Sequence, residues 1–142
     1  MNLKRLIPLA LLFTVLFAFV PAHAQAKSHR VLFALTSSDE ADWKLMLGNI
    51  RNLISGLAPN LVEVEVVAYG PGISSVQKGS AVEAEIMSLE VQHVNFVACE
   101  NSMKIKHISA TDLVSGVRSV PAGIVEVVVK QEQGWSYIKS GK

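Results

Sequence analysis

Residues 94–104 read VNFVACENSMK, an apolar run that ends in the chain's one cysteine and is followed at once by polar side chains. A short apolar run bounded in this way is typical of a fully buried strand, which we place at 94–98. Asn101 or Ser102 can cap a short helix after it, because their side-chain oxygens accept hydrogen bonds from the free N–H groups of a first helical turn. The stretch therefore predicts a strand followed directly by a helix, with Cys99 at the junction.

The same succession of strand and helix recurs on both sides of this stretch. Alternation of this kind is typical of a parallel sheet that is covered by helices on both faces. We therefore expect a three-layer α/β fold with a mostly parallel sheet of about five strands. Apolar or β-branched runs predict these strands at 31–35, 61–69, 94–98, 117–120 and 135–138. Helical spacing of apolar residues predicts helices within 37–59, 76–91, 101–108 and 121–133.

Two serines are followed three residues later by an acidic residue, which is the spacing of a capping box at a helix start. Ser37 with Glu40 forms the first pair, and Ser109 with Asp112 forms the second. We expect the first pair to begin the helix within 37–59, and the second to begin a helical turn before Leu113.

The segment 121–133 is ambiguous when it is read by composition alone. Its many β-branched residues favour a strand, whereas Pro121 at its start and Gly134 just after its end favour a helix. A helix here completes the alternation of strands and helices, and we therefore predict one.

The first 24 residues have the layout of a secretory signal peptide. Basic residues precede an apolar run at 6–20, and an Ala-x-Ala pattern ends at Ala24. The apolar run is shorter than the ~20 residues that a membrane helix needs, so an uncleaved anchor is the weaker alternative. We expect cleavage after Ala24, or two residues later, and a single mature domain at 25–142. The mature protein would then be periplasmic or secreted.

Charge and histidine spacing exclude several classes of partner. The chain has 13 basic and 12 acidic residues; without Lys4 and Arg5 of the signal peptide, 13 − 2 = 11 basic residues remain, for a net charge near −1. With no basic run, nucleic acid is a poor partner, and we expect no membrane association after cleavage. The histidines show no metal-ligand spacing. We expect no metal and no cofactor.

A ligand of an open parallel sheet binds outside the carboxyl ends of the strands. Glu63 and Glu65 lie on the early half of their predicted strand, away from that edge, and we interpret both as solvated. Several polar or small residues instead follow directly after predicted strands. The candidate binding residues at that edge are Thr36, Ser37, Gly70, Asn101, Ser102 and Gly123, and the candidate catalytic residue is Cys99.

The position of Cys99 allows two interpretations. A helix N-terminus stabilises a thiolate, and Lys104 acts in the same direction, whereas Glu100 opposes it. A free cysteine is equally often a small buried hydrophobe. No histidine is placed to form a nucleophile pair, because His93 precedes the strand and lies ~20 Å from Cys99 at about 3.3 Å per residue.

Three segments of the chain resemble the DsrE/DsrF-like family of small sulfur-relay-related proteins. They are FVACENSMK at 96–104, ISATDL at 108–113 and SVPAGIVEVVVKQEQGWSYI at 119–138. The resemblance implies a three-layer α/β fold with a parallel sheet and a helix at about 121–133. It also implies homo-oligomers, often trimers or hexamers.

In sulfur-transferring members of that family, a cysteine accepts sulfur as a persulfide and passes it on, and the matching residue here is Cys99. Asn101 and Ser102 match the turn that follows that cysteine, and Gly70 and Gly123 would shape the pocket. The members named for sulfur relay are cytoplasmic, whereas this chain is predicted to be exported.

Two functions remain open on the sequence alone. The first is an exported sulfur carrier that uses Cys99 as persulfide acceptor and exchanges sulfur with a donor or acceptor protein. The alternative is a non-catalytic small-ligand-binding module, or an oligomeric interaction module, in which Cys99 is a structural pocket residue.

Overall fold

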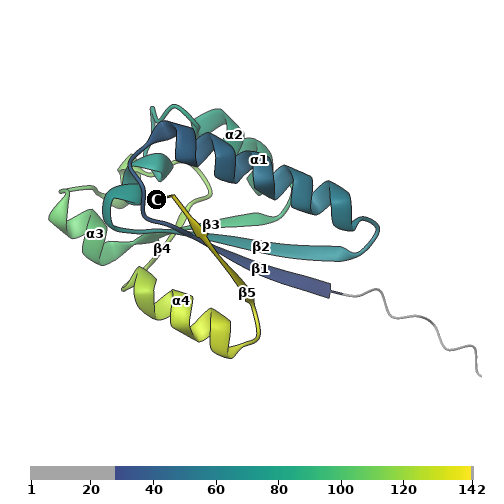
Figure 1. The fold of residues 1–142 in the computed structure, drawn as a ribbon. Coiled ribbons are helices and arrows are strands. Elements are labelled where there is room, and N and C mark those ends of the chain that lie inside the picture. The colour runs from purple at the N-terminus through teal and green to yellow at the C-terminus, as the bar shows by residue number, and fades with distance from the viewer. Residues whose placement is uncertain (1–27, 142) are drawn as a thin grey trace, which may run out of the picture.

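The computed structural model describes residues 28–141, which form a single five-stranded sheet with helices on both faces (Figure 1). All neighbouring strands pair in parallel, in the order β4-β3-β2-β1-β5. The predicted α/β fold class is therefore confirmed, and the predicted signal peptide at 1–24 lies outside the described residues. The strands are β1 (Ser28–Leu35), β2 (Leu61–Ala68), β3 (Val94–Cys99), β4 (Arg118–Val120) and β5 (Ser136–Ser140).

The helices cover the two faces of the sheet unequally. Figure 1 shows α1 and α2 above one face and α4 alone on the other, with α3 beyond the end of the strands. The ambiguous segment 121–133 is a helix, as predicted. The α-helices are α1 (Glu40–Leu57), α2 (Glu83–Glu90), α3 (Glu100–Ile105) and α4 (Gly123–Glu132), and two 3₁₀ turns, η1 (Gly70–Val76) and η2 (Ala110–Asp112), connect them to the strands.

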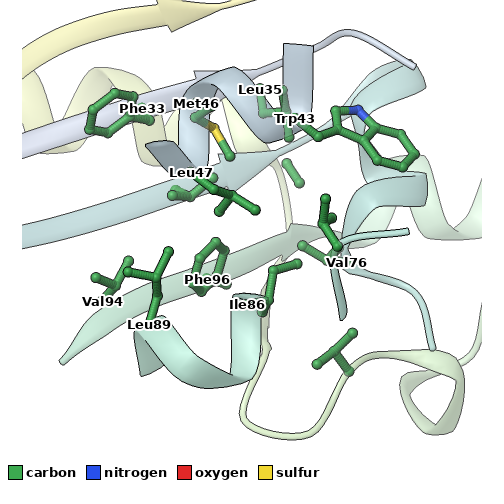
Figure 2. Packing of buried hydrophobic residues seen from close by; sticks show 14 of the residues in the cluster. Phe33, Leu35, Trp43, Met46, Leu47, Val76, Ile86, Leu89, Val94 and Phe96 are labelled. Atoms are coloured by element: carbon green, nitrogen blue, oxygen red, sulfur yellow. The ribbon is translucent and has the colours of Figure 1, made fainter. Parts of the chain in front are cut away.

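The main core lies between the sheet and the α1–α2 layer. Apolar side chains at alternate strand positions point to that face, because successive residues of a strand point to opposite sides. Figure 2 shows Phe33 beside Met46 of α1, and Phe96 between Leu47 of α1 and the residues Ile86 and Leu89 of α2. A smaller cluster fills the α4 face and consists of Leu32, Ala34, Val67, Val97, Val127 and Trp135.

The start of α1 differs from the predicted capping box. The N-cap is Asp39, whose carboxylate accepts a hydrogen bond from the N–H of Ala41 at 2.9 Å. The Ser37 hydroxyl instead accepts from the N–H of Asp39 at 3.1 Å, outside the helix. The box of Ser37 and Glu40 was therefore wrong, because an aspartate directly before the helix reaches the free N–H groups of its first turn.

The second capping box is confirmed, although it begins the 3₁₀ turn η2. The carboxylate of Asp112 accepts from both the N–H of Ser109, at 2.7 Å, and the Ser109 hydroxyl, at 2.6 Å. These hydrogen bonds lower the pKa of Asp112 below its ordinary value.

The predicted helix at 101–108 is displaced along the chain. Cys99 itself is the N-cap of α3, which begins at Glu100 and ends at Ile105. The expectation that Asn101 or Ser102 caps this helix was wrong, because strand and helix follow one another without an intervening loop. Both residues lie in the first helical turn, where their N–H groups have no partner within the helix.

Candidate functional site

Cys99 ends β3 at the carboxyl edge of the sheet, as predicted, and its side chain is only 5 % exposed. It packs against the start of α4, where Gly123 makes the closest approach. A Cβ atom at position 123 would lie 3.1 Å from the Cβ of Cys99 and 3.0 Å from the Cβ of Tyr69. Glycine at position 123 therefore lets the backbone of α4 reach the cysteine.

The surroundings of the Cys99 sulfur favour the thiolate. Burial raises the pKa of the thiol, but the hydrogen-bond donors around it, namely the N–H of Gly123, the hydroxyl and N–H of Ser102 and the N–H of Asn101, outweigh it. The net effect lowers the pKa of Cys99 below its ordinary value, since hydrogen bonds to the charged form stabilise that form. A larger fraction of Cys99 is therefore thiolate at neutral pH than in an unperturbed cysteine.

The Ser102 hydroxyl is oriented by the turn that follows β2. The N–H of Gly70 donates a hydrogen bond of 2.8 Å to the Ser102 oxygen. With its oxygen engaged as an acceptor, the hydroxyl keeps its own proton for the Cys99 sulfur. Ser102 is buried, and its hydrogen bond from Gly70 joins the turn after β2 to the helix that follows β3.

Four of the predicted binding residues thus surround Cys99, namely Gly70, Asn101, Ser102 and Gly123. Thr36 and Ser37 do not join them, because β2 separates β1 from β3 in the sheet. The carbonyl of Ser37 accepts a hydrogen bond from the indole N–H of Trp43 at 2.7 Å. The side chain of Ser37 packs against Gly141, which follows β5.

One tyrosine beside the site, Tyr69, was missed as a site residue by the sequence analysis. Burial, then the neighbouring Tyr137, and then the charge on Cys99 raise the pKa of Tyr69 above its ordinary value. Tyr69 therefore stays a neutral phenol beside the thiolate. The signal available in the sequence was strand alternation, which places Tyr69 on the same side of its strand as Val67, the neighbour of Gly123.

Glu65 contradicts the expectation that it is solvated. Its side chain is 1 % exposed beneath α4, and its Oε2 lies 2.8 Å from the Lys130 Nζ and 3.5 Å from an Nη atom of Arg118. Lys130 also lies 3.6 Å from Glu126 and 4.4 Å from the centre of the Trp135 ring. Glu63, by contrast, is exposed as expected.

Within residues 28–141, no group of three or more His, Cys, Asp or Glu side chains could hold a metal ion. None of the helices in that part of the chain has both the length and the apolar character needed to cross a membrane. His93 lies just before β3, at the end of the strand opposite Cys99.

Replacement of Ser102 by alanine tests the hydroxyl's contribution to the thiolate. We expect Ser102→Ala to react about tenfold more slowly with iodoacetamide at pH 7, because a hydrogen bond to a charged group is worth roughly 1.5 kcal/mol. The rate profile should also shift to higher pH, since loss of a hydrogen bond to the thiolate raises the thiol pKa. Ser55→Ala is the matched control, because its hydroxyl also donates one hydrogen bond, to the Asn52 carbonyl, but lies in α1 and not in η1 or α3. Equal rates in the two variants would contradict the expectation.

The fold is similar to that of solved structures. The structure of a protein of unknown function, MTH1491 from Methanobacterium thermoautotrophicum, is 34% identical and superposes with a TM-score of 0.75, covering 78% of this chain and 98% of that one. The YchN protein of E. coli is 13% identical, with a TM-score of 0.62 and the same coverage, and it shows the fold alone. No curated protein matches the sequence at a significant level.

The family comparison covers most of the chain. A model of the DsrE/DsrF-like family matches residues 16–140, a range that includes every strand of the sheet and the whole neighbourhood of Cys99. Together with the all-parallel fold and the similarity to MTH1491, this match confirms the resemblance seen in the sequence. The chain belongs to the DsrE/DsrF-like family.

Proposed function

We propose that this protein is an exported sulfur carrier in which Cys99 accepts a sulfur atom as a persulfide and passes it to an acceptor. The observation that carries the proposal is the set of hydrogen-bond donors around the Cys99 sulfur, which lowers the pKa of the thiol despite its burial. The thiolate is the nucleophile in thiol–disulfide and persulfide exchange. The related sulfur-relay function of the family supports the same assignment.

The loading step needs no oxidant or cofactor. The Cys99 thiolate attacks a sulfane sulfur of the donor, and a new S–S bond forms as the S–S bond within the donor breaks. The shortened donor leaves with the electron pair of the broken bond as a thiolate or polysulfide anion. The N–H groups of Gly123, Asn101 and Ser102, which face the sulfur, would also stabilise the charge of a persulfide anion.

Export and self-association are parts of the same proposal. The layout of the first 24 residues supports export. An apolar stripe on the outer side of α4 supports a homo-oligomer, because large contiguous apolar patches on a protein surface mark interaction sites. Its members Ile124, Val125, Val128 and Val129 are each at least 36 % exposed. Partner copies of the chain would cover this stripe and leave the Cys99 edge for exchange with a donor or acceptor protein.

Mass spectrometry of the protein recovered from the periplasm tests the proposal. After incubation with inorganic polysulfide, the intact mass should increase by whole sulfur atoms, and Cys99→Ser should show no increase. Native spectra of the same sample report the subunit count, and the intact mass reports whether the chain begins after Ala24. An unchanged mass in the wild-type protein would refute the carrier function, and a monomer would refute the self-association.

A ligand-binding module without sulfur chemistry is the second candidate. The burial of Cys99 favours it, since a cysteine that is only 5 % exposed fits the role of a structural pocket residue. The same mass measurement separates the two functions, because a purely structural Cys99 gains no sulfur.

A further inference from the structure

A pocket lies on the other side of Ser102 from the proposed sulfur site. It has a volume of about 230 Å³ and lies between the turn after β2 and helix α3. Its exposed wall consists almost entirely of carbon atoms. The residues that line it are Gly70, Pro71, Ser102, Ile105 and Lys106.

The pocket and Cys99 share two residues of their walls. Ser102 lines the pocket and its hydroxyl is one of the donors that lower the pKa of Cys99, and Gly70 lines the pocket while its N–H donates to that hydroxyl oxygen. An occupant of the pocket therefore contacts Ser102, one of the donors that surround Cys99.

Apolar contact and positive charge occur together at the pocket. Ile105 is 79 % exposed although it is a large aliphatic residue, and it forms part of the wall. Lys106 is the one charged residue that lines the pocket, and because the exposed wall is almost entirely carbon, it lines it with its aliphatic stem; no acidic residue lines the pocket. Within residues 28–141, Lys106 forms no ion pair. The wall therefore suits a ligand that has an apolar body and a negative charge.

The volume restricts the size of that ligand. Pockets for drug-sized ligands are roughly 300–1,000 Å³, and this pocket is smaller, so it has room for a compact organic group. We propose that it binds the organic part of a small carboxylate-bearing persulfide, R–S–SH, that donates its outer sulfur to Cys99. This inference rests on the proposed sulfur-carrier function and adds the class of the donor.

The transfer balances without another reactant. The Cys99 thiolate attacks the outer sulfur of R–S–SH, and the Cys99 S–S bond forms as the R–S–S bond breaks. The proton stays on the transferred sulfur, and R–S⁻ leaves with the electron pair. The leaving thiolate then lies on the pocket side of Ser102, beside the positive charge of Lys106.

Sulfur loading from matched donors tests the inference. The donors are N-acetylcysteine persulfide, the uncharged amide of the same persulfide, and inorganic polysulfide, which has no organic body. Lys106→Gln should slow loading from the carboxylate donor about three- to fivefold, the size expected of one exposed ion pair, and leave the amide unaffected. Ile105→Ser should slow both organic donors by a similar factor, because it removes apolar contact.

The controls separate failure of the pocket from failure of the carrier function. Lys44→Gln makes the same change of charge in α1, outside the pocket wall, and should leave all three rates unchanged. Inorganic polysulfide should load every one of these variants at the wild-type rate. If polysulfide loads Cys99 but the organic donors do not respond to Lys106→Gln or Ile105→Ser, the pocket inference is overturned and the carrier function stands. If polysulfide loads nothing, the carrier function fails and the inference fails with it.

Discussion

Replacement of Lys130 by methionine is expected to lower the free energy of unfolding at pH 7 by about 3–5 kcal/mol, the cost of leaving a buried charge without its partner. The carboxylate of Glu65 is 1 % exposed, and the Lys130 Nζ at 2.8 Å is its closest cation. Among residues 28–141, the other oxygen of Glu65 has no hydrogen-bond partner. Arg118, at 3.5 Å and 60 % exposed, is a weaker substitute. Urea unfolding of the wild type and the variant measures the difference.

The effect of Lys130→Met should depend on pH in a defined direction. Burial raises the pKa of Glu65 above its ordinary value, the hydrogen bond and charge of Lys130 act against this, and the neighbouring Glu126 adds to it. A raised carboxyl pKa means that the folded state binds the proton more tightly, so stability falls as pH rises through the folded pKa. Without Lys130 that pKa rises further. The penalty should therefore be largest at neutral pH and shrink in acid, where Glu65 is protonated.

Two further variants distinguish loss of the ion pair from general damage. Glu65→Leu combined with Lys130→Met should recover most of the lost stability, since an apolar pair often replaces a buried ion pair at no cost. Lys44→Met removes an exposed partner of Glu40 at 3.6 Å and should change stability by no more than about 0.5 kcal/mol. If Lys130→Met and Lys44→Met have equal effects, Glu65 is not held by a buried ion pair.

Glu65 also shows where sequence reasoning reaches its limit in this chain. The alternation of valine and glutamate at 62–66 is the local pattern of a half-exposed strand, and Glu63 follows it. Glu65 departs from it because α4 covers that position, and the covering helix comes more than fifty residues later in the chain. No local pattern contains the information that Lys130 lies above Glu65.

The fold itself was predictable because its signals are local and repeated. Five apolar runs separated by helical segments suffice to predict a parallel sheet, and topology decided the ambiguous segment at 121–133 correctly in favour of α4. The site was predictable only in part. Chain order places Cys99, Gly70 and Gly123 at one edge of the sheet, but strand order decides which loops meet there. The order β4-β3-β2-β1-β5 brings the loops after β2, β3 and β4 together and leaves Ser37 apart.

Replacement of Gly72 by alanine should have the second large effect, a loss of about 3 kcal/mol or more, at the upper end of what overpacking costs. A Cβ atom at this position would collide with the carbonyl oxygen of Leu35 and lie 2.7 Å from its carbonyl carbon. Both atoms belong to the backbone at the end of β1, which cannot move aside as a flexible side chain can. The turn η1 would have to move away from the sheet instead.

A displacement of η1 should also change the reactivity of the Cys99 thiol. Gly70, two residues before Gly72 in the same turn, holds the Ser102 hydroxyl that stabilises the Cys99 thiolate. We therefore expect Gly72→Ala to lose stability in urea unfolding and also to slow alkylation of Cys99 by iodoacetamide in the fraction that remains folded. A pure packing defect would change the first quantity and leave the second unaltered.

Gly56→Ala is the matched control and should have the opposite sign. Gly56 is the last residue but one of α1, and a Cβ atom there would meet no heavy atom within 4 Å. Alanine is favoured over glycine in a helix interior by about 0.8–1.0 kcal/mol, which is an upper bound for the last turn, so this variant should be more stable than the wild type and keep its alkylation rate. Opposite effects of the same substitution would show that Gly72 is required by the close approach of η1 to β1. If Gly72→Ala unfolds at the same urea concentration as the wild type, the close contact between η1 and the end of β1 is contradicted. The argument that this contact positions Ser102 through Gly70 is then contradicted as well.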